Sequence, residues 1–118
     1  MLVTGFSLHC VAVFSRTQLS SGLPILTAPS DGTESVTVMV FVGAGSRYEE
    51  QKERGISHFL EHMFFKGGQK YRNTQAVSAA IDGVGGDFNA FTGKEYAGYY
   101  VKVAEPEIEM NCDGLSDM

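Results

Sequence analysis

Two histidines and a glutamate, His58, Glu61 and His62, stand at a spacing that could bind and use a metal ion. On a helix, residues four apart project from the same face, so the two imidazoles could hold one ion. A catalytic zinc site also needs a third protein ligand and an open position for water. A carboxylate on that face could take a proton from the water as it attacks a carbonyl carbon. The pattern predicts zinc ligands at His58 and His62 and a general base at Glu61, although H-x-x-E-H also arises by chance on amphipathic helices.

The segment that carries these residues is typical of a helix. Ile56–Phe65 contains no helix breaker, and Gly67 and Gly68 supply a stop signal. A second helix is expected over Thr74–Asp82, with Thr74 as its N-cap and Gly83 as its C-terminal signal. Its apolar stripe consists of Val77, Ala80 and Ile81.

Strand patterns precede and follow the two helices. Leu19–Leu23 predicts a turn between two short strands, because Ser and Gly cluster there. Val36–Val42 is apolar on both faces, which predicts a strand that is covered on both. Phe88–Thr92 and Glu95–Val103 predict a hairpin, whose Gly-first loop at Gly93 and Lys94 suits a type II′ turn.

The last segment predicts a third helix. Pro106 is acceptable in a first helical turn, and Ile108, Cys112 and Leu115 recur with helical spacing. This pattern reaches Met118 without a cap, so we expect the chain to stop inside a helix. The elements together predict an α+β fold, a largely antiparallel sheet with helices packed on one face.

Composition excludes several classes of protein. With 43% hydrophobic and 19% charged residues, the 118-residue chain resembles a soluble globular domain. A net charge of −5 without a basic stripe makes nucleic acid an unexpected partner. No run approaches the roughly 20 apolar residues that cross a bilayer, so no membrane span is expected. Two cysteines, Cys10 and Cys112, favour a reducing compartment, although one bridge between them stays possible.

The first fifteen residues differ from the rest. Met1–Ser15 is apolar enough for the central part of a signal peptide, but it has no preceding Lys or Arg and no clear cleavage site. A non-functional extension is the alternative interpretation. We therefore divide the chain into an unmatched extension, 1–15, and a domain, 16–118.

Two blocks make a family resemblance specific. Gly45–Glu49 with Gly55–Gly67 closely resembles the zinc signature of the pitrilysin, insulin-degrading enzyme and mitochondrial processing peptidase family. Gly85–Tyr96 is similar to the segment that follows the zinc helix in that family. The details look most like the small-subunit, processing-peptidase branch, in which two proteins or two halves form a closed chamber. The domain 16–118 would then be part of the N-terminal catalytic domain.

The resemblance implies Zn²⁺ as cofactor, His58 and His62 as ligands, and Glu61 as the base that serves peptide-bond hydrolysis. It also implies that Asn89, Ala90, Phe91 and Thr92 bind substrate as an added β-strand. The implied substrates are peptides or unfolded polypeptides, and the implied partner is a second homologous domain or subunit. For Asn89 and Thr92, ordinary hairpin polarity is the alternative. The compartment expected is the cytoplasm, or the mitochondrial matrix in a eukaryote.

The third zinc ligand is the main departure from the family. There it is a glutamate roughly seventy to eighty residues beyond the second histidine of this inverted motif. The chain ends before that distance is reached, and its four later glutamates come too early to be assigned: Glu95, Glu105, Glu107 and Glu109. Hence we expect the 118 residues to be inactive alone. A non-catalytic structural or partner subunit of the same fold stays the alternative.

Overall fold

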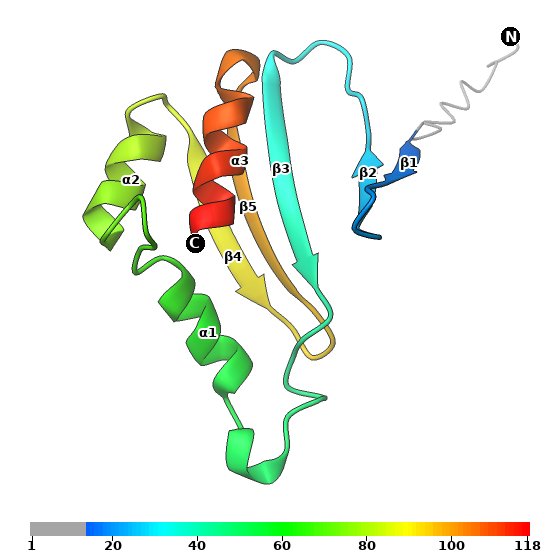
Figure 1. Cartoon of the computed structure of the whole chain (residues 1–118), viewed down its shortest axis with the longest axis vertical. Helices are drawn as coiled ribbons and strands as arrows, with labels where there is room; N and C mark the ends of the chain where they lie inside the picture. Colours follow the sequence, from blue (N-terminus) through cyan, green and yellow to red (C-terminus); the bar gives the residue numbers. More distant parts are fainter. Residues whose placement is uncertain (1–13) are drawn as a thin grey trace, which may run out of the picture. The chain divides into compact units, whose positions relative to one another are not determined.

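The computed structural model describes residues 14–118, which divide into two compact units, one ending at Thr33 and one spanning Glu34–Met118 (Figure 1). No helix within residues 14–118 is long and apolar enough to cross a membrane. The strands are β1 Ser15–Gln18, β2 Pro24–Thr27, β3 Ser35–Val42, β4 Asp87–Thr92 and β5 Ala97–Ala104. The helices are α1 Ile56–Phe64, α2 Thr74–Asp82 and α3 Ile108–Asp117, with short 3-10 helices at Gln51–Glu53 and Glu105–Glu107.

The first unit contains the hairpin predicted around Leu19–Leu23. Strands β1 and β2 pair antiparallel from Ser15 opposite Thr27 to Gln18 opposite Pro24. The turn closes through the Leu19 N–H, which donates to the Leu23 carbonyl at 2.9 Å. Gly22 has a φ of +90°, a conformation that glycine adopts without steric cost. The predicted turn between two short strands is confirmed.

The second unit is built on a three-stranded antiparallel sheet in the order β3-β5-β4. Strand β5 is central: Val101 lies opposite Val38 of β3 and opposite Phe88 of β4. The α+β prediction is confirmed, and the hairpin predicted after the second helix is the β4-β5 pair. Within the described residues, β3 and β4 are the edge strands of this sheet.

The core lies between the sheet and the three helices, which cover one face. Strand β5 buries alternate side chains, because successive residues point to opposite faces. Its inward residues are Ala97, Tyr99, Val101 and Val103. Val77 and Ile81 of α2 and Leu115 of α3 complete the buried set. From α1, the Phe64 ring stacks on Tyr99 with centroids 3.9 Å apart. The helices are therefore packed on one face, as predicted.

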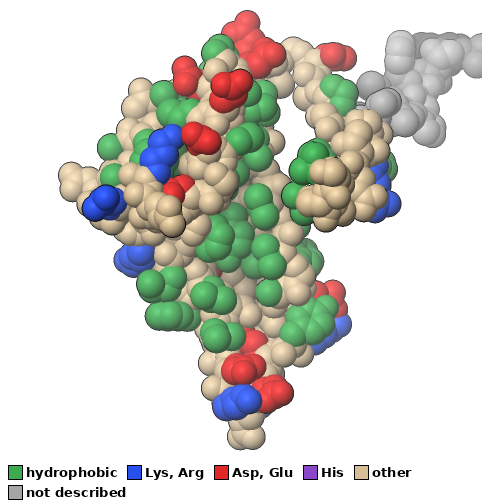
Figure 2. Space-filling view, viewed as in Figure 1, with side chains coloured by type: hydrophobic (Ala, Val, Ile, Leu, Met, Phe, Trp, Pro, Cys, Tyr) green, Lys and Arg blue, Asp and Glu red, His purple; other side chains and the backbone are tan. Residues whose placement is uncertain are grey.

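Strand β3 is more exposed than its apolar sequence predicts. Met39 and Phe41 point to the face without helices and are 40% and 63% exposed, and Val40 and Val42 on the helical face are 45% and 42% exposed. Among the described residues, the prediction of cover on both faces is wrong for this half of β3. The reason is that α1 and α2 pack against β4, and only α3 makes substantial contact with β3. Figure 2 shows apolar side chains at the surface between α1 and β3.

Two predicted details shift by one residue. Asn73, not Thr74, caps α2: its side-chain oxygen accepts the Ala76 N–H at 2.8 Å. In the hairpin, the Gly93 N–H donates to the Tyr96 carbonyl at 2.9 Å, so the turn is at Lys94 and Glu95. Gly93 has no positive φ, and the predicted type II′ turn is wrong. The carbonyl of Lys94 is held by the Arg47 N–H at 2.8 Å, which restrains the turn from outside the hairpin.

Helix α3 faces the core with a different stripe from the one predicted. Leu115 is buried, but Ile108 is 37% exposed and Cys112 lies at the surface. Asn111 and Gly114 take the inward positions instead. Because these two residues are small or polar, the spacing of apolar residues does not indicate the buried face of α3. Cys112 forms no disulfide within residues 14–118, and its possible partner Cys10 lies outside them.

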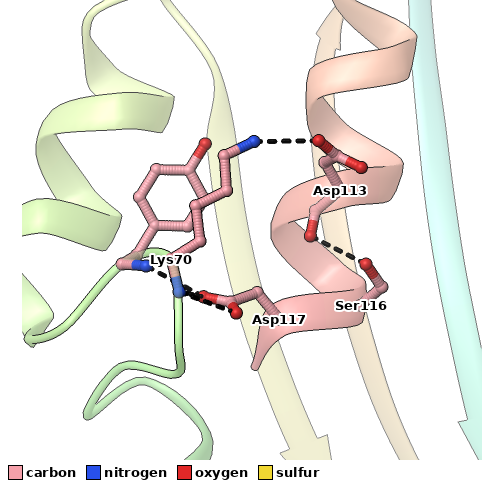
Figure 3. Close-up of polar contacts among 5 residues, drawn as sticks. Lys70, Asp113, Ser116 and Asp117 are labelled. Carbon is pink, nitrogen blue, oxygen red and sulfur yellow. Dashed lines mark hydrogen bonds and ion pairs between the residues drawn. The ribbon is translucent and has the colours of Figure 1, made fainter.

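The end of α3 holds the loop that follows α1 (Figure 3). The Asp117 carboxylate accepts the backbone N–H groups of Gln69, Lys70 and Tyr71, each at 2.9 Å. These donors, that of Tyr71 foremost, lower the pKa of Asp117 because they stabilise its charged form. The Lys70 ammonium adds an ion pair with Asp113 at 2.8 Å. The loop behind the histidine-bearing helix is thereby tied to the last helix.

Candidate metal centre

The two histidines converge at the surface of α1. Their Nε2 atoms lie 3.1 Å apart and their ring centroids 4.6 Å apart. Two nitrogens at about 2.0–2.1 Å from a tetrahedral zinc ion are about 3.3 Å from each other. The donor set and its spacing therefore fit two ligands of one zinc ion with little movement. His58 is well exposed, at 69% of its side chain, so an ion could reach the pair from solvent.

A third ligand is not provided by the described part of the chain. Residues 14–118 contain no group of three His, Cys, Asp or Glu side chains that could hold a metal ion. Glu61 has Oε2 4.0 Å from Nδ1 of His58, the ring nitrogen turned away from His62. Glu95, one of the glutamates left unassigned above, forms an ion pair with Arg47. The geometry is that of two ligands with an adjacent carboxylate.

Glu61 lies between α1 and the sheet. Its side chain is only 20% exposed, and its Oε2 accepts a hydrogen bond from the Thr92 hydroxyl of β4. Tyr99 lies close by, and its pKa is raised first by burial and then by the negative charge of Glu61. The carboxylate is therefore held at the junction of the helix and the edge strand, beside the imidazole pair.

Glu49 fixes the start of α1, a role that the sequence reasoning missed. Its two carboxylate oxygens accept the N–H groups of Gly55 at 2.7 Å and of Ser57 at 2.9 Å. These bonds, that of Gly55 foremost, lower the pKa of Glu49. A negative charge is favourable at a helix N-terminus, where N–H groups lack partners within the helix. An acidic residue a few positions before an uncapped helix was the signal available in the sequence.

Strand β4 places the four predicted substrate-binding residues on an edge of the sheet. The register turns Ala90 and Thr92 towards the helices, and Asn89 and Phe91 to the opposite face. Asn89 is exposed, and its side-chain oxygen accepts the Ala90 N–H at 2.8 Å. Phe91 packs edge-on against Phe41 and Tyr96, with centroids 6.1 and 6.2 Å away. A strand edge of this kind can pair with an extended peptide.

Comparisons with known proteins agree with the resemblance seen in the sequence. The profile of the family described as Insulinase (Peptidase family M16) matches residues 25–118. An uncharacterized zinc protease of Streptomyces coelicolor is 40% identical over 93% of this chain and 24% of its own length. The mitochondrial-processing peptidase subunit beta of Dictyostelium discoideum is 42% identical over 86% of this chain and 22% of its own.

A solved structure shows the same fold. The crystal structure of a protease from Helicobacter pylori superposes with a TM-score of 0.84, at 25% identity, and covers 91% of this chain and 25% of that one. The chain thus spans about a quarter of the length of the relatives it matches.

Proposed function

Because the chain belongs to the insulinase family of peptidases, family M16, we propose that it carries the metal-binding and proton-accepting part of a zinc metalloendopeptidase. The observation that supports this most directly is the approach of the His58 and His62 Nε2 atoms to 3.1 Å, with Glu61 beside them. The relatives named as zinc proteases make zinc the expected ion.

The residues divide the work between binding and proton transfer. His58 and His62 would hold the ion, whose role when bound is to polarise a water molecule and a carbonyl group. Glu61 accepts a proton from the attacking water, since a carboxylate within reach of the water can act as general base. The hydrogen bond from Thr92 of β4 holds that carboxylate near His58, with Oε2 at 4.0 Å from Nδ1. The proton then passes from Glu61 to the amine that leaves as the peptide bond breaks.

Substrate binding is proposed at the free edge of β4. Within the segment Asn89, Ala90, Phe91 and Thr92, the main-chain groups that point to the free edge would pair with an extended peptide, so peptides or unfolded polypeptides are the proposed substrates. Asn89 at present satisfies the Ala90 N–H with its own side chain, so this donor is protected until a strand is added. A second homologous domain or subunit is proposed to close the site, in keeping with the likeness to a processing-peptidase subunit.

A non-catalytic subunit of the same fold is the second candidate function. In that case Glu61 would be a helix residue bonded to Thr92 without a role in hydrolysis.

Zinc titration by calorimetry tests the binding half of the proposal. The 118-residue chain should bind zinc weakly, since two protein ligands leave half the tetrahedral shell to water. His58→Ala with His62→Ala should remove this binding, and Glu61→Gln should retain it. Unchanged binding in the double histidine variant would place the metal elsewhere.

Peptide hydrolysis tests the other half, in the protein as its gene encodes it. Glu61→Gln should reduce turnover by about 100-fold or more, because it removes the base and leaves both histidines in place. The 118 residues alone should cleave no peptide at a measurable rate. Normal turnover of the Glu61→Gln protein would favour the non-catalytic reading of this carboxylate.

A further inference from the structure

We propose that Thr92 is a positioning residue that fixes the carboxylate of Glu61, so that strand β4 sets the geometry of the base as well as receiving the substrate. The inference rests on the proposed function of Glu61 as general base. In this proposal the Thr92 side chain orients Glu61, and the Thr92 main chain stays available for pairing with a peptide.

The register of the sheet explains why Thr92 can reach α1. Thr92 lies opposite Ala97, which is 3% exposed on the helix-covered face of β5. Residues opposite each other in an antiparallel pair share a face, so the Thr92 side chain points towards the helices. Helix α1 packs on β4, and the Thr92 hydroxyl donates to Glu61 Oε2. The contact joins residues 31 positions apart in the chain.

The hydrogen bond restricts a side chain that would otherwise have several conformations. Glu has three rotatable bonds, and burying or fixing it costs rotamer entropy. The bond occupies Oε2 and leaves Oε1 without a partner among the hydrogen bonds of the described residues. Oε1 is then the oxygen that stays free to accept a proton. A base that is held in advance spends no free energy on orientation during the reaction.

The surroundings of Glu61 make the Thr92 hydroxyl a specific partner. The Glu61 side chain is 20% exposed, so bulk water competes weakly for its inner oxygen. His58 Nδ1 is also nearby, but at 4.0 Å from the same oxygen it lies beyond hydrogen-bond distance. Loss of the hydroxyl would leave Oε2 half-buried without this hydrogen bond, and the Glu61 carboxylate could then rotate.

The test compares three variants in the protein as its gene encodes it. Thr92→Val removes the hydroxyl and keeps the branched shape, and Thr92→Ser keeps the hydroxyl. Thr37→Val is the matched control, because Thr37 is exposed on the face of β3 that points away from the helices. We expect Thr92→Val to lower kcat roughly 10- to 100-fold, with KM and zinc affinity within about twofold of the parent. Thr92→Ser should stay within about threefold in kcat, and Thr37→Val should match the parent.

A second readout needs no activity. In metal-free protein, Thr92→Val and Glu61→Leu each remove the same hydrogen bond, so their shifts in Tm should not add when combined. Additive shifts would overturn the proposal, as would normal kcat in Thr92→Val or an equal loss in Thr92→Ser. A rise in KM with unchanged kcat would make Thr92 a substrate contact and would also overturn it. Failure of the proposed function looks different: there, Glu61→Gln itself is active.

Discussion

Asn111 should be a residue whose replacement makes the protein more stable. Its side chain is 2% exposed on the inner face of α3, and neither Oδ1 nor Nδ2 has a hydrogen-bond partner within residues 14–118. A buried amide without partners costs about 1–3 kcal/mol. Asn111→Leu keeps the branch at Cγ and removes both polar atoms. Asn111 lines a cavity of about 10 Å³ whose other lining residues are mostly apolar, so a leucine side chain there would contact apolar atoms.

The expected gain in the free energy of unfolding is therefore about 1–3 kcal/mol. For a chain of this length, 1 kcal/mol corresponds to roughly 4 °C in Tm, so thermal unfolding followed by circular dichroism should show a rise of about 4–12 °C. Cys112→Leu is the control, because it changes an exposed position of the same helix and reports helix propensity alone. A Tm for Asn111→Leu at or below that of the parent would refute the reasoning. The amide would then have a partner in solution, such as one water molecule in the cavity.

Three further predictions concern other contacts of the fold. Asp117→Asn should lower Tm at neutral pH and should make Tm fall less steeply in acid. The Tyr71 N–H is the main group that depresses the pKa of Asp117 in the folded state. The stabilisation by this carboxylate is therefore present above the unfolded pKa of about 3.9 and is lost as pH falls through the folded pKa. Gly67→Ala should lower the free energy of unfolding, measured in urea, by about 1–3 kcal/mol, because φ is +107° and a Cβ would meet the Tyr71 carbonyl oxygen at 2.3 Å. The control Gly43→Ala should leave this free energy unchanged, because no atom lies within 4 Å of a Cβ there. The 118-residue chain should self-associate in sedimentation velocity, and Phe41→Lys, at a side chain 63% exposed, should reduce this; a monomeric parent chain would contradict it.

Local signals in the sequence were sufficient for the helices and for the histidine pair. Helix α2 has the predicted bounds, and α1 ends one residue earlier than expected, at Phe64. His58 and His62 meet because one turn of α1 brings residues four apart together, and no distant contact is needed. Their role as zinc ligands stays a prediction, as does that of Glu61 as base.

Features that depend on packing were out of reach of the sequence. The bond between Thr92 and Glu61 requires both the register of β4 on β5 and the docking of α1. The inward face of α3 was missed because Asn111 and Gly114 carry no apolar signal. The cap of α2 was placed on Thr74 because Asn73 and Thr74 are adjacent and both are good capping residues.

The tie between Asp117 and the loop after α1 has a consequence for how the protein is made. During translation, Gln69, Lys70 and Tyr71 are added to the chain 46 to 48 residues before Asp117. At about 5–20 residues per second, roughly 2–10 seconds pass between the synthesis of this loop and that of Asp117. During that interval the loop after α1 lacks the three hydrogen bonds to Asp117, although Phe64 at the end of α1 can already stack on Tyr99. A nascent chain halted before Asp117 should therefore expose the loop Gln69–Tyr71 to proteases, and a chain extended past Asp117 should protect this loop.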